Sequence, residues 1–273
     1  MILSKRMKFF SYMNQLIFWI DVLLTAIIPG LIATWLGVGG CFLRIPMFMY
    51  LFNVNIKTAY CLNQAVVALT TIPGVIEHKR KYHIYTRGLI TAAVGAVLGV
   101  AVGAYMVAKI ISTTALKGIF GAACILVGIY IIYNTIKKRG KLIKRVTIKE
   151  VGKLEYGLKL FILMFLAGLA TGLCGFGGGI YYVPLFIALS YPTHVAIGTS
   201  SAEMIATAGM GSAVLTLSGY MDVMLFIAVG IPTLFASWMG AKLASKSPPW
   251  LLRIIYALSI IGAGAYVVIE SFL

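Results

Sequence analysis

Two small groups of polar side chains stand inside long apolar runs. Thr199, Ser200 and Ser201 form one group, and Asn63 and Gln64 form the other. A buried amide or hydroxyl without a hydrogen-bond partner costs roughly 2 kcal/mol or more, so such groups need partners. They can donate to a bound anion. The alternative is that they bond to backbone carbonyls of their own or a neighbouring helix.

Two charged side chains lie in apolar runs close to these groups. Arg44 would be a strong anion partner if buried, but near a segment end it could extend to lipid headgroups instead. Glu203 follows the serine pair, and a carboxyl group removed from water favours its neutral form and could carry a proton. The alternative is a hydrogen bond or ion pair that fixes helix packing. His194 is expected to be a cap or interface residue, because no second ligand lies at metal-binding spacing.

A glycine cluster precedes each polar group. Each cluster ends an apolar run and begins a short segment that contains a proline, Pro46 or Pro184. Unwound backbone at membrane depth must face protein or a water-filled cavity, so the clusters indicate the lining of a site. Their free N–H groups and the positive end of the short helix favour an anion. The alternative is that these glycines only allow close helix packing. They are Gly37, Gly39 and Gly40 in the first half, and Gly175, Gly177, Gly178 and Gly179 in the second.

The two clusters belong to an internal duplication. Residues 30–47 align without a gap to residues 168–185, which pairs Arg44 with Tyr182. With one residue dropped from the following turn, the Asn63–Gln64 pair aligns with Ser200 and Ser201, at a repeat of roughly 137 residues. Repeats of this kind are typical of transporters that place their site at the repeat interface.

Composition indicates a polytopic membrane protein. Of the 273 residues 61% are hydrophobic and only 11% are charged, with a mean hydropathy of +0.98. The net charge of +16 fits the positive-inside rule and anionic lipid headgroups better than nucleic acid. The four cysteines lie in apolar surroundings without C-x-x-C spacing, so they are expected to be packing residues rather than a zinc site or disulfides.

The apolar runs predict helices, two of which are short. Residues 41–52 would reach only about 18 Å as a helix, whereas the bilayer core is about 30 Å thick. This piece is therefore a half-helix or re-entrant segment, or one arm of a broken span completed by residues 58–76. The other predicted helices cover residues 16–37, 88–110, 115–136, 158–175, 179–190, 193–217, 222–245 and 249–271.

Basic residues predict the topology. The N-terminal arm, residues 77–87 and residues 137–153 are rich in lysine and arginine, and we expect all three in the cytoplasm, with the N-terminus. Each half then crosses the membrane four times, which makes the halves parallel. Lys242, Lys246 and Arg253 near one outer turn count against this and keep an inverted arrangement open. The predicted units are a first repeat (1–136), a basic cytoplasmic linker (137–156) and a second repeat (157–273).

These motifs resemble the sulfite exporter TauE/SafE family, also called the 4-toluene sulfonate uptake permease family. The resemblance rests on the doubled G-x-G-G-G pattern, the proline five residues on and the A-x-G-T-S motif, and it covers nearly the whole chain. It is stronger in the second half, because Cys41 replaces the last glycine of the first motif and CLNQ replaces GTSS. It implies about eight spans from a four-span duplication, and movement of sulfite, sulfonates and related organosulfur anions across the plasma membrane.

The sequence thus predicts an all-α polytopic membrane protein with two homologous four-crossing halves and broken or re-entrant helices after the glycine motifs. Its expected function is secondary transport of a small sulfur-containing oxyanion, with Glu203 as the candidate proton carrier. It is not expected to be an enzyme. Its partners would be the small anion and the lipid bilayer of the cell inner membrane, with no nucleic acid, cofactor or metal; a homodimer is left open. The alternatives are a transporter of another small anion, an intramembrane enzyme that uses Cys174 or His194, and a non-transporting scaffold. The predicted substrate-binding residues are Gly39, Gly40, Arg44, Asn63, Gln64, Gly177, Gly178, Gly179, Thr199, Ser200 and Ser201.

Overall fold

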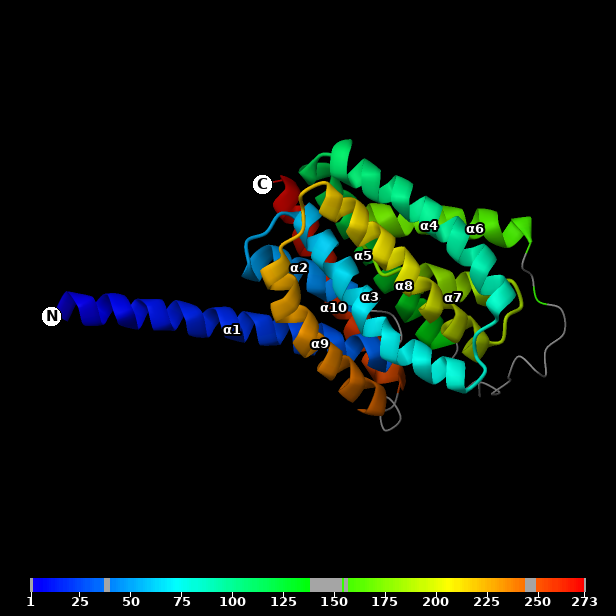
Figure 1. Ribbon diagram of the computed structural model, residues 1–273, viewed down its shortest axis with the longest axis horizontal. Coiled ribbons are helices and arrows are strands. Elements are labelled where there is room, and N and C mark those ends of the chain that lie inside the picture. Colours follow the sequence, from blue (N-terminus) through cyan, green and yellow to red (C-terminus); the bar gives the residue numbers. More distant parts are fainter. Residues whose placement is uncertain (1, 37–39, 138–153, 155–156, 244–248, 273) are drawn as a thin grey trace.

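The computed structural model describes residues 2–36, 40–137, 154, 157–243 and 249–272, and in this part of the chain it is all-helical (Figure 1). Five of the described helices are long and apolar enough to cross a membrane. The predicted all-α membrane class is therefore confirmed. The helices are α1 (Ile2–Leu36), α2 (Cys41–Leu51), α3 (Ile56–Arg80), α4 (Thr86–Lys109), α5 (Thr113–Lys137), α6 (Leu158–Cys174), α7 (Gly179–Ala188), α8 (Thr193–Leu217), α9 (Val223–Leu243) and α10 (Pro249–Phe272).

Local sequence explains where several helices begin and end. The Asn55 side chain accepts a hydrogen bond from the Thr58 N–H at 2.9 Å and caps α3. Asp222 caps α9 in the same way through the Leu225 N–H, also at 2.9 Å. Gly175 ends α6 with a φ of 68°, a left-handed conformation that glycine adopts without steric cost. Capping residues and glycines thereby mark where these helices begin and end.

The helix α4 has one face suited to contact with lipid and one face suited to packing against another helix. Its outward face carries Ile90, Val94, Leu98 and Val102, each between 46% and 60% exposed. Large apolar side chains on the surface are expected where the solvent is hydrocarbon. The opposite face carries a row of glycines that packs against α6. Gly95, Gly99 and Gly103 lie directly against the α6 backbone at Phe161, Phe165 and Leu169, so the two helices approach closely and run in the same direction.

Two other helix pairs run in opposite directions. Along α3 and α8, Lys57 near the start of α3 meets Tyr220 just after α8, and the Cys61 thiol meets Thr216. Along α5 and α10, Lys117 pairs with Glu270 at 2.7 Å, near the start of α5 and the end of α10. Parallel halves would have α3 and α8, and likewise α5 and α10, pointing the same way. The structure contradicts the predicted parallel arrangement.

The two ends of the bundle can be told apart by their connections. The N-terminal end of α1 and the C-terminal end of α10 lie toward the same end of the molecule, and residues 81–85 lie toward the other (Figure 1). The contact between the Phe18 and Phe52 rings, at 5.8 Å between centroids, fixes α1 to the end where α2 finishes and α3 begins. The N-terminal arm and residues 77–87 therefore do not share one side, contrary to the expectation from charge.

Candidate functional site

The second glycine cluster forms a sharp turn between α6 and α7. Gly175 and Gly178 both have left-handed backbone, with φ of 68° and 80°. A Cβ on Gly175 would lie 2.4 Å from the Tyr60 ring, and one on Gly178 would overlap the Tyr182 ring, so larger residues do not fit. The Gly178 carbonyl accepts the first helical hydrogen bonds, from the Tyr181 N–H at 2.9 Å and the Tyr182 N–H at 3.0 Å. The N–H groups of the first turn of α7 have no acceptor within that helix, and Gly179 begins it.

Gly40, the last glycine of the first cluster, precedes α2. Gly40 is buried and lies directly against the backbone of Pro29 in α1, so any side chain there would clash. The Arg44 N–H bonds to the Gly40 carbonyl at 3.0 Å and starts α2. Gly37 and Gly39 lie outside the described residues.

The two clusters meet in the middle of the protein. The Phe42 ring, in α2, packs on the Phe176 ring between α6 and α7, with centroids 4.2 Å apart. Cys41, which replaces a glycine of the first motif, lies against the backbone of Gly177. The start of α2, which follows the first glycine cluster, is therefore in contact with the second break.

A hydrogen-bonded chain crosses this contact. Arg44 is 1% exposed and donates from Nη1 to Asn63 Oδ1 at 3.2 Å. Asn63, fully buried in α3, donates from Nδ2 to the Gly175 carbonyl at 2.9 Å. This chain links α2, α3 and the end of α6. The guanidinium does not extend to the lipid surface, so the alternative role considered for Arg44 does not hold in this structure.

A second polar group faces inward from α8. Ser200, Glu203 and Thr207 follow helical spacing along one face, and each is at most 1% exposed. Tyr182, the counterpart of Arg44, lies near Glu203 and Thr207, although its hydroxyl makes no hydrogen bond of good geometry with the described residues. The Ser200 hydroxyl and both Glu203 carboxylate oxygens likewise have no hydrogen-bond partner among the described residues. Buried polar atoms in this state are rare in folded proteins and indicate a place where a ligand, proton or water belongs.

Gln64 extends this group toward α3. Its side chain is fully buried and packs on Gly211 of α8, where an added Cβ would overlap its amide oxygen. Neither its amide oxygen nor its amide nitrogen has a hydrogen-bond partner among the described residues. Gly211 is therefore needed as glycine to make room for the amide between the helices.

Two of the predicted residues point elsewhere. Thr199 accepts a hydrogen bond from the Tyr85 N–H at 3.1 Å, at the end of the bundle where α4 begins. Ser201 donates to the Ile197 carbonyl of its own helix at 2.8 Å, which is the alternative that the sequence left open. The structure thus places Arg44 and Asn63 at the glycine breaks and Gln64 between α3 and α8. Ser200 and Glu203 are buried on the face of α8 that also carries Thr207, and Thr199 and Ser201 lie outside these groups.

The site also contains residues that the sequence did not single out for a role. Tyr182 and Thr207 line the group around Glu203, and the only signal for Tyr182 was its alignment with Arg44. Tyr60 packs against Gly175 and is fully buried. Aromatic residues are common in helices, so their types and spacing gave no reason to choose these.

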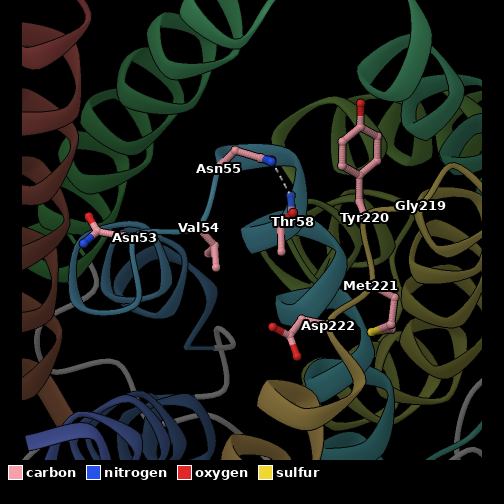
Figure 2. Close-up of a pocket in the computed structure, with 8 residues that line it drawn as sticks. All are labelled: Asn53, Val54, Asn55, Thr58, Gly219, Tyr220, Met221 and Asp222. Atoms are coloured by element: carbon pink, nitrogen blue, oxygen red, sulfur yellow. Dashed lines mark hydrogen bonds between the residues drawn. The ribbon is translucent and has the colours of Figure 1, made fainter. Parts of the chain in front are cut away.

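The pocket drawn in Figure 2 lies at the end of the bundle rather than at the glycine breaks. It has a volume of about 310 Å³ and is formed where α2 passes to α3 and α8 passes to α9. The Asn55 and Asp222 side chains border it from the two connections (Figure 2). Between the breaks themselves the aromatic rings of Phe42 and Phe176 are in contact.

An all-helical bundle with several apolar spans and buried polar groups at its centre is the architecture of a polytopic membrane transporter. Comparison with known proteins gives the family. The profile of the sulfite exporter TauE/SafE family matches residues 22–267, and the chain belongs to this family of membrane transporters.

Curated relatives agree with this assignment. A probable membrane transporter protein of Methanocaldococcus jannaschii is 26% identical over 257 residues, which cover 88% of this chain and 91% of the relative. A probable membrane transporter protein of Bacillus subtilis is 25% identical over 238 residues, covering 85% and 93%. A sulfite exporter TauE/SafE family protein of Arabidopsis thaliana is 29% identical over 114 residues, covering 41% of this chain and 27% of the plant protein. No solved structure matches.

Proposed function

We propose that this chain is a secondary transporter that moves a small sulfur-containing oxyanion across the plasma membrane, with its binding site at the meeting point of the two glycine breaks. The observation that carries this proposal is the chain from Arg44 through Asn63 to Gly175. It brings a buried positive charge and an amide to the turn from which α7 starts. A buried guanidinium in a membrane protein is costly and usually marks a substrate or ion pathway.

The anion would be held by three kinds of donor. Arg44 supplies charge and a planar array of N–H groups suited to an oxyanion. The first turn of α7, at Gly178 and Gly179, supplies backbone N–H groups and the positive end of a helix. Asn63 supplies an amide, and Gln64, next to it in α3, contributes polar atoms that have no partner among the described residues. Ser200 lies about 16 Å along α8 from Gly211, which Gln64 contacts, so its unpartnered hydroxyl would line the path of the anion rather than the same shell. Thr199 and Ser201 are left out of this shell because their hydrogen bonds lie elsewhere.

Glu203 is the proposed proton carrier. It is fully buried, and both carboxylate oxygens are without a hydrogen-bond partner among the described residues. Tyr182 lies close to it and aligns with Arg44. A carboxyl group that takes up and releases a proton beside an anion site would couple the two movements.

The scaffold for this site would be an internal duplication, which the spacing of the described helices supports. The helix α3 begins and ends 137 residues before α8, and α4 begins 137 residues before α9. Left-handed backbone recurs at the same spacing, at Asn53 and Ser190 and again at Tyr82 and Gly219. Gly168 packs on Ala96 and Gly30 packs on Thr233, two contacts that the same alignment relates to each other.

Each half would begin with a re-entrant hairpin. The helix α6 starts beside the beginning of α4, and after α7 the chain returns there, because the Tyr191 hydroxyl lies against Gly88. In the first half α1 passes Phe18 and α2 returns to Phe52, beside it. The hairpins add no net crossing, so three helices cross the membrane in each half. An odd number of crossings makes the halves inverted, in agreement with the opposed directions of α3 and α8.

The inverted arrangement also gathers basic residues outside the N-terminal arm on one side. Lys137 at the end of α5 and Arg253 near the start of α10 lie at the same end of the bundle, because α5 and α10 run in opposite directions. We assign this end to the cytoplasm by the positive-inside rule, which puts the N-terminus outside. Lys246 lies outside the described residues.

Flux of sulfite and of small sulfonates in proteoliposomes tests the proposal. Arg44→Ala and Ser200→Ala should each lower the transport rate at least about tenfold, the equivalent of about 1.4 kcal/mol of lost binding or transition-state interaction. Ser201→Ala, whose hydroxyl bonds to its own helix, is the matched control and should retain transport. Undiminished flux in both site variants would show that these residues are not part of the transport pathway. If the parent protein transports another anion but none of the sulfur oxyanions, the proposed substrate is wrong.

A further inference from the structure

The chain's three histidines gather at the cytoplasmic end of the bundle. His78 lies near the end of α3, His83 in the connection to α4, and His194 at the start of α8. His78 Nδ1 and His83 Nδ1 are 3.3 Å apart, and the His83 and His194 rings stack with centroids 5.4 Å apart and planes at 25°. Each of the three side chains is partly exposed, so protons can reach them.

These contacts fasten the connection between α3 and α4 to the start of α8. The Tyr85 N–H donates to Thr199 at 3.1 Å, and the Tyr85 and Tyr191 rings meet edge to face, 5.9 Å apart. Gly198 lies directly against the His83 carbonyl. The histidines are therefore part of a packed closure at this end.

At the other end of the bundle, the positions that align with His194 and His83 hold other residue types. At the spacing of 137 residues, Lys57 corresponds to His194 and Tyr220 corresponds to His83. Lys57 Nζ lies over the Tyr220 ring, 5.6 Å from its centroid, so the related pairs make related contacts. That end, however, holds the 310 Å³ pocket of Figure 2. Alternating access requires that the two ends close and open in turn.

The two pairs differ in how they respond to acid. The bond between His78 and His83 needs one ring nitrogen to carry a hydrogen and the other to accept it, so it is lost when both rings are protonated. Protonation would also place two like charges in the stack of His83 and His194. Histidine changes charge between pH 5 and 8, whereas lysine and tyrosine do not.

The neighbouring charged groups do not offset the repulsion that protonation of the histidines creates. Glu77 is paired with Lys81 at 2.7 Å, and both side chains are more than half exposed. Arg80 and Arg87 are exposed and add positive charge at this end. Among the described residues, Lys79 and Tyr82 are exposed beside the histidines, and the tyrosines Tyr85 and Tyr191 pack at this end.

We propose that His78, His83 and His194 form an acid-released latch that keeps the cytoplasmic end of the transport path closed at neutral pH. Uptake of protons breaks the bond between His78 and His83 and separates the stacked rings, which frees the connection between α3 and α4 from α8. The latch rests on the proposed transport function, since it regulates access to that site. Its release depends on no substrate and can be measured without one.

The test is a distance measurement between spin labels by double electron–electron resonance, with the protein in lipid nanodiscs at pH 7.5 and pH 5.5. Labels at Thr86→Cys and Ala188→Cys, both exposed, report on the cytoplasmic end. Labels at Val223→Cys and Leu51→Cys, the related positions, report on the opposite end. The four native cysteines are buried, and the unmutated protein is checked for absence of labelling.

We expect a longer distance to appear at pH 5.5 at the cytoplasmic end only. For each proton taken up on release, the ratio of open to closed molecules rises up to tenfold per pH unit. The double variant His83→Tyr with His194→Lys reproduces the Tyr220–Lys57 pair of the opposite end and should stay closed at both pH values. The variant His78→Gln keeps a neutral hydrogen-bonding group and should show a smaller change in distance between the two pH values.

An unchanged distance at the cytoplasmic end, an equal change at both ends, or an undiminished response in both histidine variants would overturn the latch. Flux measurements separate it from the substrate assignment. If the labels respond to acid but no sulfur oxyanion is transported, the latch stands and the proposed substrate fails. If sulfite is transported and the labels do not respond, the reverse holds.

Discussion

The bond between Arg44 and Asn63 is the contact whose energetics can be worked out most directly. Asn63→Leu removes the acceptor of a buried guanidinium and the donor to the Gly175 carbonyl. A hydrogen bond to a charged group contributes about 1.5–3 kcal/mol and a neutral one about 1 kcal/mol. Interhelical bonds in membranes average less, about 0.6 kcal/mol, because the unfolded chain also finds partners in lipid. We therefore expect Asn63→Leu to lower the free energy of unfolding by about 2 kcal/mol.

The combination with Arg44→Met gives the sharper expectation. Removal of Arg44 alone leaves the Asn63 oxygen without this donor, whereas removal of both partners replaces a buried polar pair by apolar side chains of similar size, which is often neutral. The double variant should thus be more stable than the sum of the single effects by at least about 1 kcal/mol. Transport should nevertheless be lost in the double variant, because the guanidinium is proposed to bind the anion.

Unfolding of the purified protein in mixed micelles, followed by tryptophan fluorescence, measures the four free energies of this cycle. Thermal stabilisation by sulfite, measured on the same samples, tests binding. Single effects that add within about 0.5 kcal/mol would show that the two side chains are not coupled. Stabilisation of the double variant by sulfite, equal to that of the parent, would refute the assignment of Arg44 to the anion.

Two further predictions concern packing. Gly168→Val should lower the apparent melting temperature, because a Cβ at this position would lie 2.2 Å from the Ala96 carbonyl oxygen and force α4 and α6 apart, at a cost of about 1–3 kcal/mol. Gly209→Ala, where an added Cβ meets nothing within 4 Å, should be neutral or stabilising by up to about 1 kcal/mol in the same assay, and an equal loss in both would contradict the packing argument. All four cysteines are free and buried. Their replacement by serine or alanine should leave sulfite flux within about threefold of the parent, because it weakens side-chain packing slightly and changes no residue of the proposed anion site. Loss of flux in a folded cysteine-free protein would favour the alternative of a thiol-dependent enzyme.

Helix positions could be predicted closely from the sequence. The predicted helix over 193–217 matches α8, and the short piece 41–52 matches α2 to within one residue. Glycine and proline disfavour a continuous helix through local backbone geometry alone, so the positions of the helix breaks can be found from the local sequence. The contact between the start of α2 and the second glycine break also agrees with the sequence analysis, which placed a site between the two repeated motifs.

The directions of the halves could not be obtained in the same way. Whether a segment of about twelve residues returns to the side it came from or continues across depends on its contacts with α3 or α8, and those contacts are not local. Charge counting placed the N-terminal arm on the same side as residues 77–87, whereas the structure places them at opposite ends (Figure 1). Lys242 and Arg253 were the residues that pointed to the inverted arrangement.

The side-chain directions within the polar group followed a simpler rule. Three consecutive residues in a helix are turned by about 100° each, so Thr199, Ser200 and Ser201 cannot all face one site. The structure directs Ser200 inward and uses the other two hydroxyls for bonds to the backbone. Spacing of three and four residues, which joins Ser200 to Glu203 and Thr207, was the better guide.

The related positions of the two halves differ in charge, and this difference bears on the proposed mechanism. Arg44 aligns with Tyr182, and Glu203 aligns with Val66, so the first half contributes a permanent positive charge and the second a carboxyl group. A duplicated scaffold with identical residues would present the same chemistry to the anion from both sides. In the proposed site an anion at Arg44 would add negative charge near the buried Glu203, and the arrival of a proton on that carboxyl group would remove the repulsion. Binding of the anion and of the proton would therefore favour each other, so Glu203→Gln should show a weaker rise of sulfite affinity at low pH than the parent and should lose proton-driven accumulation while it retains exchange of sulfite for sulfite.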